Sequence, residues 1–148
     1  MTEKAEIIKI IWVFSMLLIG SISDIRKKSV SVLFLSVTAV GCIAVSIPGF
    51  DAYLHFTGLL PGLFLLLISR ISEDVIGDGD AYAVCFIGFT FGLYAAAAVL
   101  MITLLITAAC AQLLIILKKA GRCSRIPLYP FLSIAFALRL MMITKGGN

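Results

Sequence analysis

Two aspartates stand at the edges of long uncharged stretches of the chain. Asp24 follows the first apolar run, and Asp80 ends the segment Gly77-Asp78-Gly79-Asp80 immediately before another. Two carboxylates that share one proton titrate in two coupled steps, so that one activates water while the other protonates a leaving amine. The pair therefore points to hydrolysis by general acid–base catalysis. The alternative is that both are solvated loop residues, with Asp80 acting as a helix N-cap.

The composition indicates where such a pair would act. Of the 148 residues, 61% are hydrophobic and 14% are charged, and the mean hydropathy is +1.14. Soluble domains contain about 45–50% apolar and about 25% charged residues, so a soluble globular domain is a poor explanation of this composition. We expect an all-α, polytopic membrane protein in which residues 1–148 form a single transmembrane domain.

Apolar runs predict a bundle of six membrane-spanning helices, because each crossing needs about 20 residues. The uncharged run over residues 81–117 would form a helix of about 55 Å, whereas the hydrocarbon core is about 30 Å thick. We therefore predict two crossings there, with a turn between Gly92 and Val99. The first run is expected to be a retained helix, because its strong positive cluster follows it. The predicted helices cover residues 7–23, 30–47, 52–69, 81–96, 99–117 and 126–143.

Lysine and arginine residues predict the orientation, because they concentrate in cytoplasmic loops. Eight lie on one predicted side: Arg26, Lys27, Lys28, Arg70, Lys118, Lys119, Arg122 and Arg125. Four lie toward the other: Lys4, Lys9, Arg139 and Lys145. Both termini are therefore expected outside, and the two aspartates at the cytoplasmic boundary. The net charge of +4 and the pI near 9.0 reflect this topology and not a nucleic-acid partner.

The cysteines and the histidine offer no competing catalytic set. Cys42, Cys85, Cys110 and Cys123 are scattered and form no C-x-x-C pair, so we interpret them as small buried apolar side chains. His55, the only histidine, falls near the opposite face, and we interpret it as an interfacial residue. The chemistry expected of two aspartates requires no metal ion and no organic cofactor.

Taken in order, the motifs resemble those of the type IV prepilin peptidases and the related archaeal preflagellin peptidases, which are GxGD membrane aspartyl proteases. Asp24-Ile25-Arg26-Lys27-Lys28 is similar to the first aspartate of that family and its basic tail. Gly77-Asp78-Gly79-Asp80 is similar to the motif of its second aspartate. Ile126-Pro127-Leu128-Tyr129-Pro130-Phe131-Leu132 is similar to the I-P-F-x-P-F-L start of its last helix. The resemblance covers nearly the whole chain.

The resemblance implies a membrane-embedded aspartic endopeptidase. Such an enzyme cleaves the short basic leader of a prepilin-like or preflagellin-like membrane protein at the cytoplasmic boundary of the cell membrane. Asp24 and Asp80 would be the catalytic residues. The partners implied are this substrate and the lipid bilayer, in a type IV pilus or protein secretion system.

Five further residues are implied in substrate binding. Gly77 and Gly79 would let an extended substrate pass close to the second aspartate. The acidic side chains of Glu73, Asp74 and Asp78 would add negative potential that attracts a basic leader.

The chain also departs from the family pattern. Val30-Ser31-Val32 stands where small members often have Ile-Pro-Asn, so the loop after Asp24 is expected to differ in shape. Longer bacterial members add an N-terminal cytoplasmic domain, often with paired C-x-x-C motifs, and N-methylate the new pilin terminus. The chain has neither feature, and we expect peptidase activity without methyltransferase activity.

Other classes account for parts of the pattern. A small ion- or proton-coupled transporter would place acids within the membrane span, whereas here they lie at boundaries or in loops. A non-catalytic scaffold of a pilus or secretion assembly would tolerate Asp24→Asn and Asp80→Asn. The presenilin and signal peptide peptidase group shares Gly-x-Gly-Asp, but has Tyr-Asp where this chain has Ser23-Asp24.

Overall fold

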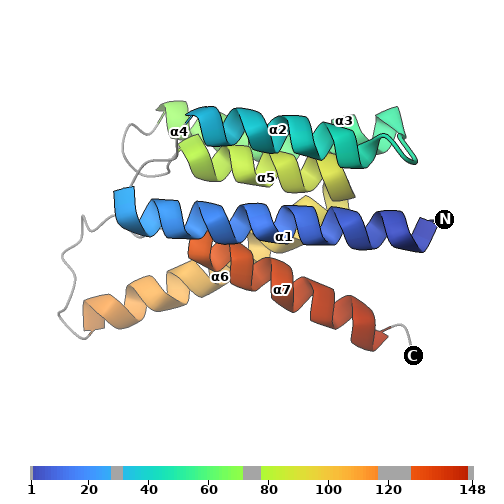
Figure 1. Cartoon of the computed structure of the whole chain (residues 1–148). Helices are drawn as coiled ribbons and strands as arrows, with labels where there is room; N and C mark the ends of the chain where they lie inside the picture. The colour runs from blue at the N-terminus through green and yellow to red at the C-terminus, as the bar shows by residue number, and fades with distance from the viewer. Residues whose placement is uncertain (1, 28–31, 72–77, 117–127, 147–148) are drawn as a thin grey trace.

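The computed structural model describes residues 2–27, 32–71, 78–116 and 128–146. Every regular element in these ranges is an α-helix, which confirms the predicted all-α class (Figure 1). The seven helices of the described residues are α1 (Thr2–Lys27), α2 (Val32–Ser46), α3 (Ala52–Gly58), α4 (Leu60–Ile71), α5 (Asp78–Phe91), α6 (Leu93–Ile116) and α7 (Tyr129–Gly146).

The predicted helix over residues 52–69 is divided at Leu59 into α3 and α4. Pro61 lies in the first turn of α4, where its missing N–H leaves no helical bond to break. In a continuous helix, the N–H of residue 61 would donate to the carbonyl of Thr57, four residues earlier. Proline has no N–H, so this hydrogen bond cannot form. The two short helices together still form an apolar span from Ala52 to Ile71.

Three of the predicted helix limits are wrong for local reasons. The turn between α5 and α6 falls at Gly92, so the predicted helix limits at residues 96 and 99 do not hold. Gly92 has φ +85°, a left-handed conformation that glycine adopts without steric cost. At the other end of the chain, Asp24 does not close the first helix. α1 continues to Lys27, because arginine and lysine are good helix formers.

The helices run back and forth along a common direction, and the two termini lie at the same end of the bundle (Figure 1). The opposite end holds the end of α1, the end of α4 and the beginning of α5. Asp24, near the end of α1, and Asp80, in the first turn of α5, are thereby placed toward the same end.

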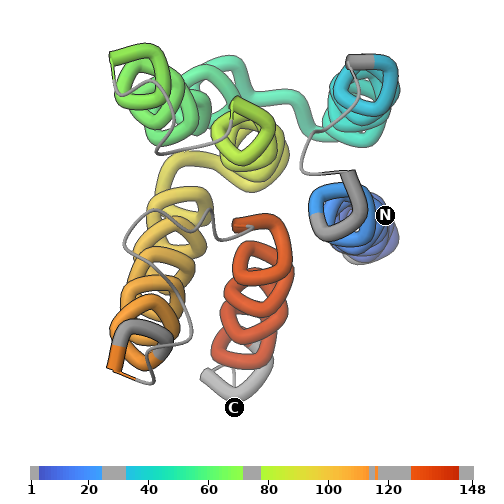
Figure 2. The backbone as a smooth tube through the Cα atoms, turned by 90° about the vertical axis from the view of Figure 1, so that its left-hand side faces the viewer, coloured from blue at the N-terminus to red at the C-terminus, as the bar shows by residue number. Residues whose placement is uncertain are grey.

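Helix α5 is the centre of the arrangement. It packs against α1, α2, α3, α4 and α6, and Figure 2 shows it surrounded by the other helices while α6 and α7 extend to one side. Half of its residues are buried, among them Ala81, Val84 and Ile87. A helix with neighbours on several sides has a defined position, and this one carries Asp80 at its beginning.

Glycines allow α5 to lie directly against α3 and α4. A Cβ atom built on Gly58 would lie 1.9 Å from the carbonyl oxygen of Gly88, and one on Gly62 would lie 2.3 Å from the sulfur of Cys85. Gly58 ends α3 and Gly62 lies in the first turn of α4, so each of the two short helices presents a glycine to the backbone of α5. The absence of side chains at these positions therefore sets the distance between the helices.

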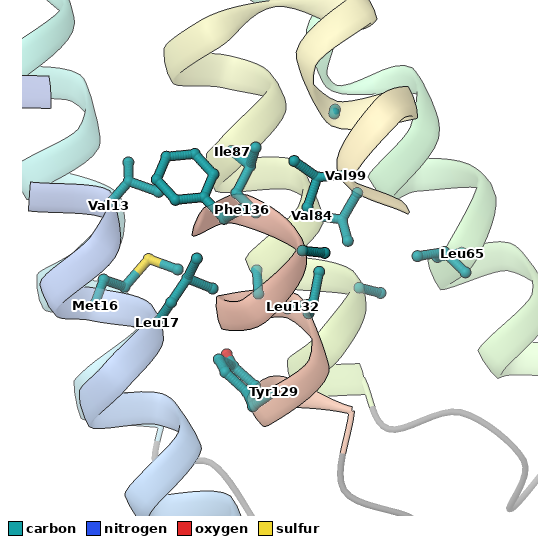
Figure 3. Packing of buried hydrophobic residues seen from close by; sticks show 14 residues of the cluster. Val13, Met16, Leu17, Leu65, Val84, Ile87, Val99, Tyr129, Leu132 and Phe136 are labelled. Atoms are coloured by element: carbon teal, nitrogen blue, oxygen red, sulfur yellow. The ribbon is translucent and has the colours of Figure 1, made fainter. Parts of the chain in front are cut away.

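The core joins α1, α5, α6 and α7. Val13, Met16 and Leu17 of α1 face Leu132 and Phe136 of α7 in a cluster of fully or nearly fully buried side chains (Figure 3). α7 therefore holds its position by apolar packing on α1, which also fixes where its first residue lies.

In the part of the chain that the structure describes, three helical spans are long and apolar enough to cross a membrane: Lys4–Asp24, Ala52–Ile71 and Leu93–Leu113. Large hydrophobic side chains are exposed on their outer faces, including Ile11 at 63%, Phe64 at 63% and Leu105 at 67%. A soluble protein rarely exposes apolar surface on this scale, which is typical of helices solvated by lipid.

Candidate active site

Asp24 lies in the last turns of α1 and caps the start of another helix. Its carboxylate accepts a hydrogen bond from the backbone N–H of Tyr129, the first residue of α7. The first N–H groups of a helix have no partner within it, and the helix dipole favours a negative charge there. The Oδ2 atom of Asp24 is also buried, and no described residue donates a hydrogen bond to it.

Asp80 is half-buried in the first turn of α5. Two residues earlier, the Asp78 carboxylate accepts a hydrogen bond of 2.5 Å from the Ser69 hydroxyl near the end of α4. This bond ties the beginning of α5 to α4. Asp78 itself is exposed, so the two acids of the Gly-Asp-Gly-Asp segment differ in their surroundings.

Tyr129 connects the two aspartates. It is completely buried, and its hydroxyl donates a hydrogen bond of 3.1 Å to the carbonyl oxygen of Gly79, the residue directly before Asp80. The phenol interacts electrostatically with the carboxylates of both Asp80 and Asp24. The two acidic groups therefore converge on one aromatic side chain from different helices.

Gly20 makes room for that side chain. A Cβ atom at this position would lie 2.4 Å from Cε1 of Tyr129 and 2.6 Å from Cδ1. Gly20 precedes Asp24 by four residues, so both lie on the same face of α1. The ring of the tyrosine thus packs on the backbone of α1 one turn away from the carboxylate.

The structure brings together part of the predicted site. Asp24, Gly79 and Asp80 gather around the tyrosine, whereas Asp78 is engaged with α4. The remaining predicted residues of this segment lie outside the described residues: Glu73, Asp74 and Gly77.

Reasoning from the sequence missed Tyr129 and Gly20. A signal existed for each: Tyr129 is the only hydroxyl in the segment 126–132, and Gly20 is one helical turn from a candidate catalytic acid. Neither feature of the sequence indicates that α1 and α7 pack together, so the contact between Gly20 and Tyr129 is seen only in the tertiary structure.

His55 lies at the end of α5 away from Asp80, where the sequence placed it, and its side chain is enclosed by protein. It is completely buried, its Nδ1–H donates to the carbonyl oxygen of Phe89, and its ring stacks on Phe50. Phe89 lies in the last turn of α5, where carbonyl groups lack helical partners. A buried histidine at this place caps the C-terminal end of α5, remote from the Asp80 end.

The predicted burial of the cysteines holds for Cys42 and Cys85 and is wrong for Cys110. Cys42 and Cys85 are buried, whereas Cys110 is half-exposed on the outer part of α6. The difference arises because α6 extends beyond the helices that cover it near its start. Cys123 lies outside the described residues.

Comparison with known protein families, curated proteins and solved structures finds no match for this chain.

Proposed function

We propose that the protein is a membrane-embedded aspartic endopeptidase that cleaves the short basic leader of prepilin-like or preflagellin-like proteins. The observation that carries the proposal is the convergence of Asp24 of α1 and Asp80 of α5 on Tyr129 of α7. Two carboxylates close to lipid are energetically unfavourable, so such residues are usually functional. A two-aspartate hydrolase requires both carboxylates at one site.

The proposed membrane topology has six crossings with both termini outside, α3 and α4 together forming the third. The alternation of helix direction and the common location of the termini support it. The end that carries Asp24 and Asp80 would face the cytoplasm, because Arg26 and Lys27 end α1 there and Arg70 is exposed near the end of α4.

The length of α5 supports a site at the membrane boundary. It has 14 residues and is about 21 Å long, shorter than the hydrocarbon core of about 30 Å. Helix α5 packs against five other helices, and Asp80 in its first turn is half-buried, so the helix is held within the protein and its polar beginning does not have to face lipid alone. A substrate helix that stays in the bilayer would present its leader junction at this level.

In the proposed mechanism, one carboxylate of the pair is ionised and removes a proton from the attacking water. The water oxygen bonds to the scissile carbonyl carbon, and the second, protonated carboxyl gives its proton to the leaving nitrogen as the C–N bond breaks. No described residue donates to the Oδ2 atom of Asp24, so this oxygen keeps its acceptor capacity for a water admitted with the substrate.

The proposal is tested by co-expression with a prepilin-like protein of the same genome and by scoring the loss of its leader as a mobility shift. Asp24→Asn and Asp80→Asn keep side-chain size and remove the titratable group, so both should accumulate in the membrane and cleave nothing. Asp51→Asn is the matched control, because Asp51 is an exposed cap of α3 at the other end and asparagine also caps helices. Cleavage that survives either site substitution would contradict the proposal.

A further inference from the structure

We infer that Tyr129 is a positioning residue that holds Asp24 and Asp80 in one arrangement. The inference rests on the proposed function for its catalytic meaning. Tyr129 makes one contact to each side of the pair: its backbone N–H to the Asp24 carboxylate and its hydroxyl to the Gly79 carbonyl.

The two contacts depend on different parts of the residue. The bond to Asp24 comes from the main chain at the start of α7 and would persist with any residue except proline. The bond to Gly79 comes from the side chain and disappears when the hydroxyl is removed. The side chain of Tyr129 therefore governs the position of Asp80 relative to Asp24.

Packing alone does not require the hydroxyl. The ring lies in the apolar cluster with Leu17, Leu132 and Phe136 (Figure 3), where phenylalanine would fill the same space. A buried phenol needs a hydrogen-bond partner, and here the partner is the backbone next to a candidate catalytic acid. The hydroxyl thus links the core to the beginning of α5.

The ring itself is held by Gly20. Since a Cβ atom there would lie 2.4 Å from Cε1 of Tyr129, Gly20→Ala would displace the ring by about 1 Å to restore ordinary contact. This shift would weaken the bond from the tyrosine hydroxyl to the Gly79 carbonyl, and kcat should fall by at most the roughly tenfold expected for its complete loss. Gly20→Ala would therefore affect the position of Asp80 through the Tyr129 side chain, as removal of the hydroxyl does.

The first experiment compares steady-state cleavage of a purified prepilin-like substrate by wild type and Tyr129→Phe. We expect kcat to fall about tenfold, the order for one lost hydrogen bond to a positioned group, with KM within about twofold. Tyr94→Phe is the matched control, because it removes a phenol that is 88% exposed on α6. An unchanged kcat in Tyr129→Phe would overturn the inference.

The second experiment is a double-mutant cycle with Gly20→Ala. If both substitutions act through the tyrosine hydroxyl, the variant carrying both should be no slower than Tyr129→Phe alone. Effects that multiply would mean that the ring and the hydroxyl act on separate targets, which contradicts the inference.

The third experiment does not depend on proteolysis. Backbone amide hydrogen exchange of residues 81–84, in the early turns of α5, should accelerate roughly fivefold in Tyr129→Phe because its anchor is lost. Exchange in α6 should stay unchanged in the same sample. If wild type cleaves no leader, the proposed function fails while faster exchange still supports the positioning role, and unchanged exchange overturns that role.

Discussion

Gly20 of α1 and Tyr129 of α7 are in direct contact, at a separation that leaves no space for even one methyl group on the glycine. One turn further along α1, Asp24 receives the backbone N–H of the same tyrosine. α1 and α7 thus make two contacts: the Tyr129 ring packs on the backbone at Gly20, and the Asp24 carboxylate caps the beginning of α7. Together with the bond from Tyr129 to Gly79, these contacts bring Asp24 and the segment that carries Asp80 to the same tyrosine.

The contact between Gly58 and Gly88 should be sensitive to a single methyl group. A Cβ atom on Gly88 would lie 1.8 Å from the carbonyl oxygen of Gly58, and backbone cannot move aside as a flexible side chain does. We expect Gly88→Ala to lower the free energy of unfolding by about 2 kcal/mol or more, measured by thermal unfolding in detergent. Ala98→Ser, at an exposed position of α6, adds one heavy atom and should change it little.

The hydrogen bond between Ser69 and Asp78 should stabilise the beginning of α5. Ser69→Ala removes the donor, and we expect a loss of about 1 kcal/mol and a several-fold lower kcat, because Asp80 lies in the same helical turn. Asp78→Asn should have a similar, smaller effect, since asparagine retains an acceptor oxygen. If the pair acts as one unit, the double variant should resemble Ser69→Ala, and independent effects would refute this role.

His55 should contribute to stability and not to catalysis. His55→Phe keeps an aromatic ring between Phe50 and Phe89 but removes the N–H that the Phe89 carbonyl accepts. Leaving this buried carbonyl unpaired should lower the free energy of unfolding by about 1–3 kcal/mol. The kcat of the folded fraction should remain at the wild-type value, and a loss of kcat at unchanged stability would show that the capping role is incomplete.

The acids before the Gly-Asp-Gly-Asp segment should act on leader binding through charge. Replacing Glu73 and Asp74 by glutamine and asparagine removes two negative charges from the sequence, so KM for a basic leader should rise several-fold and depend less on salt. The kcat should stay unchanged. Equal KM values over a range of ionic strength would rule out electrostatic attraction by these residues.

Local patterns predicted much of the fold. Apolar runs indicated each helical region, and the length of the run over residues 81–117 required a turn, which the structure places at Gly92. The exact limits were harder to predict, because Arg26 and Lys27 extend α1 as readily as they would form a loop. The division at Leu59 had a signal in Pro61, whose effect depends on where the neighbouring helix begins.

The sequence by itself determined which segments are helical and which residues are chemically unusual, because hydropathy, proline, glycine and charge act over a few neighbouring residues. It singled out Asp24 and Asp80 in this way. Only the tertiary structure decided that they converge on Tyr129 and that His55 is buried as a cap. These contacts join residues from different helices, and helix packing is set by side-chain shape across the whole core, which no local pattern contains.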